Sequence, residues 1–261
     1  MGGLFMAKEL SLDALKEVDE DLGWNDIVLL SLIGVAGGVL GQLIFDVWNA
    51  STGGLLNGYL ISILVTPLNH FAPSATNYNF WPSLNISIFL FRWILGSGAI
   101  GLSLGLAMKF KVKKVLYMFA LGCLVGMAGW LATSYFVDLA YGKWLAYVAT
   151  PFTIEAVLPC MLIGSFLSLS VSEFRNVSLF FRFLFAGFLG GLVGKYIEVF
   201  FTAAMAMFLF EFRGIFETGI NPVRLTDALF VMFLTNLFCL IFLKGYLRKK
   251  IEIVKKADKI N

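Results

Sequence analysis

Six long runs of apolar residues dominate this chain. Each has about 20 residues or more, and a helix of that length crosses the roughly 30 Å hydrocarbon core of a bilayer. We therefore expect an all-α integral membrane protein with six transmembrane helices, at about 25–47, 88–108, 115–136, 151–171, 177–210 and 227–247. The composition agrees, since 59% of the 261 residues are hydrophobic and 14% are charged, against roughly 45–50% and 25% in soluble domains.

Basic residues indicate the orientation of these helices. No Asp, Glu, Lys or Arg occurs between Val47 and Phe91, whereas the connection 109–114 carries four lysines and the segment 248–250 reads RKK. With six spans and the amino terminus inside, both basic clusters face the cytoplasm, as the positive-inside rule favours. A seventh crossing would place them on opposite sides. We therefore expect both termini on the cytoplasmic side of a bacterial or archaeal cell membrane.

The uncharged stretch 48–87 is then expected to be a loop that faces outward. It is rich in Asn, Ser, Thr, aromatic residues and proline. Because it is longer than a connection needs, a lid, a docking surface and a re-entrant element are the alternatives. Within it, the apolar segment 53–68 is shorter than a span. We expect this segment to lie in the interface or to re-enter the membrane.

The two ends of the chain differ in charge. Residues 1–23 predict a cytoplasmic acidic amphipathic helix, because four apolar residues recur at helical spacing opposite acidic ones. The apolar positions are Leu12, Leu15, Val18 and Leu22. The acidity of this helix favours contact with a protein over adhesion to anionic lipid. Residues 248–261 are expected to form a basic cytoplasmic tail, and residues 24–247 the membrane domain.

Three of the expected helices share the glycine pattern G-x-x-x-G-x-x-G. Its nine glycines are Gly34, Gly38 and Gly41, then Gly122, Gly126 and Gly129, then Gly187, Gly191 and Gly194. In the six-span topology these three helices run in the same direction, which indicates three helical-hairpin repeats, the last of them degenerate. Glycines at this spacing leave one helix face without side chains, so that a second helix can approach closely. The pattern therefore predicts a compact bundle with glycine packing faces.

The segment RWILGSGAIGLSLGLAMKFKVKKVLYMFALGCLVGMAG (92–129) resembles the glycine-repeat multi-pass membrane domains of uncharacterised bacterial proteins. Some of those domains are joined to phosphopeptide-binding FHA domains. The resemblance covers about residues 30–200, and no FHA-like soluble domain is recognised in this sequence. The resemblance implies a multi-pass architecture and carries no activity with it.

Five ionisable residues fall within or beside the outward-facing halves of the expected spans: Asp46, Arg92, Glu155, Lys195 and Glu198. An unpaired charge at the bilayer centre costs about 2.5–3.5 kcal/mol on insertion scales, so such residues usually face protein, water or one another. Lys195 and Glu198 are one helical turn apart and can pair. Two hypotheses stay open. One is an ion-pair network that holds the bundle together. The other is a polar cavity lined by Lys195, Glu198 and Glu155 that binds an ion, a proton or an anionic headgroup.

Catalytic signals are scarce in this sequence. His70 is the one histidine, the three cysteines lie apart within expected spans, and nucleotide-binding and nucleophile motifs are absent. We therefore expect no enzyme activity, no cofactor, no metal site and no nucleic-acid partner. The first functional hypothesis is a membrane subunit or scaffold that forms homo-oligomers or binds partner proteins through its glycine-packed helices, with the acidic amino-terminal helix, the outward loop or the basic tail as contacts. The alternatives are a small channel or secondary transporter that uses the outer charges and, least supported, an enzyme acting on lipid through Glu155, Glu198 or His70.

Overall fold

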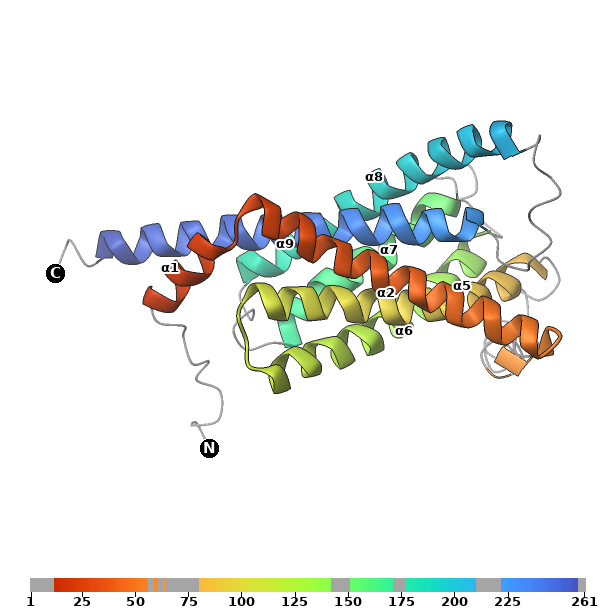
Figure 1. Ribbon diagram of the computed structural model, residues 1–261, viewed down its shortest axis with the longest axis horizontal. Helices are drawn as coiled ribbons and strands as arrows, with labels where there is room; N and C mark the ends of the chain where they lie inside the picture. The colour runs from red at the N-terminus through yellow and green to blue at the C-terminus, as the bar shows by residue number, and fades with distance from the viewer. Residues whose placement is uncertain are drawn as a thin grey trace.

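The computed structural model describes residues 12–55, 59–60, 63, 80–141, 151–170, 177–209 and 222–257. Across these ranges the chain forms seven helices and no strand, which confirms the all-α class. The helices are α1 (Leu12–Asp21), α2 (Trp24–Ser51), α5 (Phe80–Ala107), α6 (Val112–Tyr141), α7 (Pro151–Ser170), α8 (Val177–Leu209) and α9 (Pro222–Ala257) (Figure 1).

Five of the helices contain a stretch long and apolar enough to cross a membrane. These stretches are Trp24–Ser51, Phe89–Ala107, Val112–Thr133, Val177–Ala204 and Ala228–Lys256. They support an integral, multi-pass membrane protein. The remaining expected span, 151–171, corresponds to α7, whose described apolar stretch, Ala156–Leu169, is shorter than a crossing needs. A crossing by α7 therefore stays a prediction.

Two helices are longer than a single crossing requires. α8 has 33 residues and α9 has 36, which corresponds to roughly 50 Å each at 1.5 Å per residue. α9 continues through Ala257. Most of the expected tail 248–261 is therefore a helical extension of α9, because the basic residues that follow the apolar run are themselves good helix formers.

The expected outward loop 48–87 is shorter than hydropathy indicates. α2 continues to Ser51, and α5 already begins at Phe80. Hydropathy marks only the lipid-crossing part of a helix, whereas backbone hydrogen bonding extends the helix into the polar flanks. Most of the segment 53–68 lies outside the described residues.

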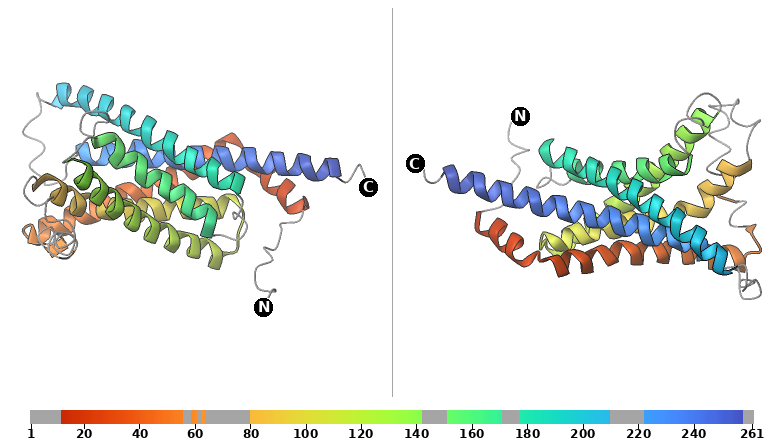
Figure 2. Two further views of the ribbon diagram at one scale, coloured as in Figure 1. Left: turned by 180° about the vertical axis from the view of Figure 1, so that it is seen from behind. Right: turned by 90° about the horizontal axis from the view of Figure 1, so that it is seen from above.

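Six helices form a closed ring in which neighbours along the chain are neighbours in space. α2 packs against α5, and each following helix packs against the next, until α9 closes the ring on α2. Successive helices run in opposite directions, so that α2, α6 and α8 share one direction (Figure 1; Figure 2). α9 also contacts α5 and α7. It therefore reaches across the ring as well as completing it.

The nine glycines of the repeated pattern lie at helix contacts with a regular assignment. In each of α2, α6 and α8, the first two glycines face the preceding helix of the ring and the third faces the following helix. Gly34 and Gly38 face α9 and Gly41 faces α5; Gly122 and Gly126 face α5 and Gly129 faces α7; Gly187 and Gly191 face α7 and Gly194 faces α9.

Most of these glycines leave no room for a side chain. A Cβ at Gly187 would lie 2.2 Å from the carbonyl oxygen of Cys160, and a Cβ at Gly191 would lie 2.7 Å from Cα of Val157. At Gly129 the nearest atom would be 3.6 Å away, an ordinary contact. The helices approach to backbone contact at the tight positions, where dispersion forces and Cα–H···O contacts hold helices together in lipid.

Large apolar side chains cover the outer face of α2. Trp24, Leu29, Leu32, Leu40 and Val47 are between 48% and 65% exposed. A continuous apolar face of this kind is rare on soluble monomers. It suits contact with lipid tails.

Candidate functional site

Lys195 and Glu198 form an ion pair on α8. Lys195 Nζ lies 2.8 Å from Glu198 Oε2, and the two side chains are 14% and 7% exposed. Thr202 Oγ1 donates to Glu198 Oε1 at 3.2 Å and shares a 3.1 Å hydrogen bond with Thr226 Oγ1 of α9. The pairing expected from their spacing is therefore present. Through Thr202 and Thr226, hydrogen bonds extend this ion pair into a chain of polar groups from α8 to α9.

Asp46 and Arg92 lie on the neighbouring helices α2 and α5 and are 4% and 2% exposed. Gln42 Nε2 donates to Asp46 Oδ1 at 3.1 Å. The Arg92 guanidinium lies 4.2 Å from the centre of the Phe89 ring and 5.9 Å from that of Trp93. A guanidinium over an aromatic face is stabilised by the negative charge of that face. Both charges are thus held inside the bundle rather than at its surface.

The backbone at Glu155 belongs to α7, but its side chain lies outside the described residues. Gly191 of α8 packs against Ala156 and Val157 of α7. Lys195 follows Gly191 by about one helical turn. The Glu155 backbone is therefore near the level of Lys195 along the bundle. Of the five expected charges, the structure joins Lys195 to Glu198 directly and puts Asp46 and Arg92 on a different pair of helices.

Asn236 of α9 is a buried polar residue that the sequence analysis missed. Its Nδ2 donates to the Leu30 carbonyl of α2 at 3.0 Å, and its Oδ1 accepts from Ser103 Oγ of α5 at 2.6 Å. The available signal was a single asparagine inside the apolar run LFVMFLTNLFCLIFL. Because a buried amide is costly unless it is hydrogen-bonded, Asn236 fixes the position at which α9 meets α2 and α5.

At the end of the bundle where α5 meets α6, α1 packs on the extension of α9. Leu15, Val18 and Leu22 are between 2% and 4% exposed and belong to the same apolar cluster as Leu247 and Ile251 of α9. Of the amphipathic helix expected within residues 1–23, the structure shows the part Leu12–Asp21, and residues 1–11 lie outside the described residues. Its contact with protein lies within the chain itself.

Two basic residues of α9 hold the backbone and the acidic face of α1. Lys244, which is 9% exposed, donates to the Leu22 carbonyl at the end of α1. Arg248 Nε donates to Asp19 Oδ1 at 3.2 Å. From Lys244 to Arg248 the contacts advance along α9, whereas on α1 they step back from Leu22 to Asp19. The two helices therefore run antiparallel along this contact.

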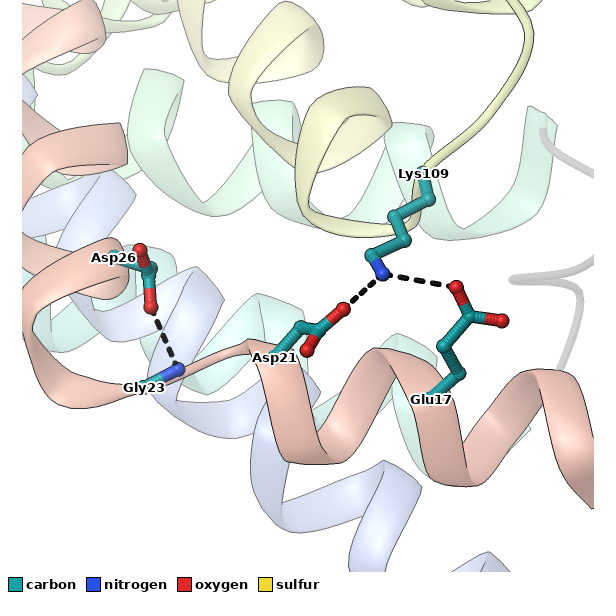
Figure 3. Close-up of polar contacts among 5 residues, drawn as sticks. All are labelled: Glu17, Asp21, Gly23, Asp26 and Lys109. Carbon is teal, nitrogen blue, oxygen red and sulfur yellow. Dashed lines mark hydrogen bonds and ion pairs between the residues drawn. The ribbon is translucent and has the colours of Figure 1, made fainter.

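A third anchor comes from the turn between α5 and α6. Lys109 Nζ lies 3.0 Å from Glu17 Oε1 and also bonds the Asp21 carboxylate (Figure 3). Between α1 and α2, Gly23 N donates a hydrogen bond to Asp26 Oδ2 at 3.0 Å (Figure 3). We use the name α1 clasp for α1 together with its three basic anchors Lys109, Lys244 and Arg248.

Local geometry presents Lys109 to α1. Lys109 has a φ of 51°, the left-handed conformation that commonly ends a helix. Phe110 N donates to the Gly105 carbonyl at 3.1 Å and Lys109 N to the Leu106 carbonyl at 2.9 Å. This is the hydrogen-bond pattern of a Schellman motif. It stops α5 and turns the lysine out of the bundle.

The electrostatics of Lys109 favour its charged form. Hydrogen bonds to Asp21 and then to Glu17 raise the pKa of the Lys109 ammonium above its ordinary value. The Lys109 side chain is 42% exposed. Its ion pairs are therefore screened by water and salt, and they contribute orientation more than stability.

Among the described residues, no group of three or more His, Cys, Asp or Glu side chains could hold a metal ion. His70 lies outside those residues. Compared with known protein families, with curated proteins and with solved structures, the chain shows no match. The resemblance to glycine-repeat membrane domains thus stays a prediction. The two candidate sites are the polar chain around Lys195 and the α1 clasp.

Proposed function

We propose that the chain is a non-enzymatic membrane subunit that binds a partner, or a second copy of itself, through a platform made by the α1 clasp. The observation that carries the proposal is the packing of α1 on the extension of α9. Three of its apolar residues are buried there, and Lys109, Lys244 and Arg248 hold its polar side. The chain thus builds a rigid two-helix surface beyond its apolar core, which lipid contact alone does not require.

The glycine faces support a structural role within the chain. Because Gly34, Gly122 and Gly187 face helices of the same chain, these grooves are filled and unavailable to a partner. The same arrangement in all three helices, with two glycines facing the preceding helix and one facing the following helix, also supports three hairpin repeats, α2–α5, α6–α7 and α8–α9. In this proposal the six-helix bundle is the anchor, and the cytoplasmic clasp makes the contacts.

Affinity purification in mild detergent, with crosslinking of lysines in native membranes, tests this function. We expect the parent to migrate as an oligomer or complex and to form crosslinks from Lys249 and Lys255. A Leu15→Asp/Val18→Asp variant, which cannot dock α1, should lose both. The matched control Leu29→Ala/Leu32→Ala shortens two exposed apolar residues of α2 without adding a polar group to its lipid-facing surface, and it should keep both. A lone monomer without crosslinks would overturn the proposal.

A small channel or secondary transporter is the second candidate. The polar chain from Lys195 and Glu198 through Thr202 to Thr226 favours it, because intramembrane charges commonly mark transport pathways. Its test is ion flux in reconstituted vesicles. Lys195→Ala and Glu155→Gln should change the flux while the protein still folds. Absence of flux in the parent, or an unchanged flux in both variants, would exclude this function.

A further inference from the structure

The turn between α5 and α6 carries an unusual concentration of positive charge. Residues 109–114 read KFKVKK, with four lysines in six positions. Lys109 is paired with Glu17 and Asp21 of α1, and Lys114 Nζ lies 4.0 Å from the centre of the Phe110 ring. Lys111 and Lys113 point into the surroundings as exposed side chains. Two lysines of the turn are therefore available to an anion.

The helix that follows does not favour these cations. α6 begins at Val112, so Lys113 and Lys114 lie in its first turn. The dipole of a helix is positive at its N-terminus, where lysine is unfavourable and an anion is favourable. An anionic group bound at the turn relieves this repulsion.

The outer face of α6 beside the lysines is apolar. Val112, Leu116 and Tyr117 are 74%, 57% and 53% exposed. Lys113, Tyr117 and Leu124 recur at helical spacing, so one strip of the surface passes from positive charge to an aromatic ring and then to aliphatic side chains. That is the order of chemical groups in a phospholipid, from the headgroup through the glycerol region to the acyl chain.

Position along the helices matches this order. The turn joins the apolar stretches Phe89–Ala107 and Val112–Thr133, both of which could cross a membrane. A short connection between two crossings lies at the membrane surface, where headgroup phosphates lie. A tyrosine one turn into α6 suits the interfacial region.

We propose that Lys111 and Lys113, with the Tyr117 and Leu124 strip of α6, bind the headgroup and acyl chain of an anionic phospholipid. The α1 carboxylates compete with the lipid phosphate for the positive charge of this turn. Glu17 and Asp21 neutralise Lys109 two residues away and oppose a phosphate by like charge. Lipid binding and docking of α1 therefore weaken each other through the same turn, by thermodynamic reciprocity. This site differs from the partner platform and does not depend on whether a partner protein binds.

Native mass spectrometry of the full chain in detergent, supplied with equal amounts of phosphatidylglycerol and phosphatidylcholine, tests the proposal. The parent should retain phosphatidylglycerol in preference. Lysines near an anionic membrane surface each strengthen binding about fivefold, so Lys111→Gln/Lys113→Gln should lower the preference by roughly 30-fold. The matched control Lys249→Gln/Lys256→Gln removes the same charge from exposed positions of α9 and should keep the preference.

A third variant separates the site from general surface charge. Glu17→Gln/Asp21→Asn frees Lys109, and it should raise phosphatidylglycerol retention above that of the parent. Tryptophan fluorescence checks that each variant folds. A parent without lipid preference would overturn the proposal. So would an equal loss in the Lys249 and Lys256 control, or unchanged retention when the α1 carboxylates are removed.

Discussion

Substitution of Gly122 by alanine measures how much the close contact between α5 and α6 contributes to stability. A Cβ at this position would lie 2.3 Å from the Ser97 carbonyl oxygen and 2.9 Å from Cα of Gly98. Both are backbone atoms, which cannot rotate away. Restoring a C···O distance of about 3.3 Å requires the two helices to separate by about 1 Å. The matched control is Gly129→Ala on the same helix, where the nearest atom is 3.6 Å away.

Gly122→Ala and Gly129→Ala should change the free energy of unfolding in different ways. A gap of about 1 Å forfeits roughly a quarter to a half of the dispersion energy of the affected contacts, and overpacked interiors lose about 1–3 kcal/mol. Alanine returns up to about 1 kcal/mol through its higher helix propensity. We therefore expect Gly122→Ala to destabilise the bundle by about 1–2 kcal/mol. Gly129→Ala should be neutral or stabilising by up to about 1 kcal/mol.

Tryptophan fluorescence during denaturant titration in micelles gives the measurement. Trp93 of α5 stacks on Trp130 of α6 with ring centres 5.7 Å apart and an interplanar angle of 14°, so two of the six tryptophans report on this helix pair. Near-ultraviolet circular dichroism of the stacked rings should weaken in Gly122→Ala before global unfolding. Equal unfolding midpoints for the two variants would refute the reasoning, because helix propensity alone would then explain both.

Three further predictions concern polar contacts. Asn236→Leu removes the hydrogen bonds to Leu30 and Ser103. It should lower the free energy of unfolding by about 0.6–1.7 kcal/mol, the range for hydrogen bonds between membrane helices. An unchanged unfolding midpoint would contradict this prediction. Glu198→Gln removes the carboxylate that pairs with Lys195 and should lower the free energy of unfolding by about 1.5–3 kcal/mol, the range for hydrogen bonds to charged groups. The double variant Lys195→Met/Glu198→Gln should recover part of this loss in the same titration, and no recovery would argue against the pair. Because its carboxylate partners raise the pKa of Lys109, the contribution of Lys109 to α1 docking is complete below the ordinary lysine pKa and is lost as pH rises through the raised value. Hydrogen exchange of the α1 amides should therefore show protection falling in that alkaline range. The variant Lys109→Met should remove this pH dependence.

The helices themselves follow from local sequence. Apolar runs identified six helical segments, and five of the resulting helices have stretches suited to crossing a membrane. The i,i+3 spacing of Lys195 and Glu198 predicted their pairing, because both partners lie on one helix. In the same way, the apolar positions Leu15, Val18 and Leu22 indicated the buried face of α1.

Contacts between distant segments were not available from local patterns. Asn236 reads as one polar residue in an apolar run, and only the arrangement of α2, α5 and α9 gives its amide two partners. The residues that bind α1 could not be predicted from local patterns either. Its acidic face indicated a protein contact, but Lys109 and Arg248 lie 88 and 229 residues from the carboxylates they bind. No residue spacing encodes such separations.

The glycines show where the two kinds of information divide. Their spacing in the sequence determined that α2, α6 and α8 would each have a face without side chains, because helical geometry places residues three and four apart together. Which helices fill that face depended on the tertiary structure, in which the first two glycines of each set meet one helix and the third meets another. Gly34 meets α9, Gly122 meets α5 and Gly187 meets α7. The physical reason is that periodicity fixes the direction of a face within its own helix, whereas the partner is decided by the packing of all six helices into one closed ring.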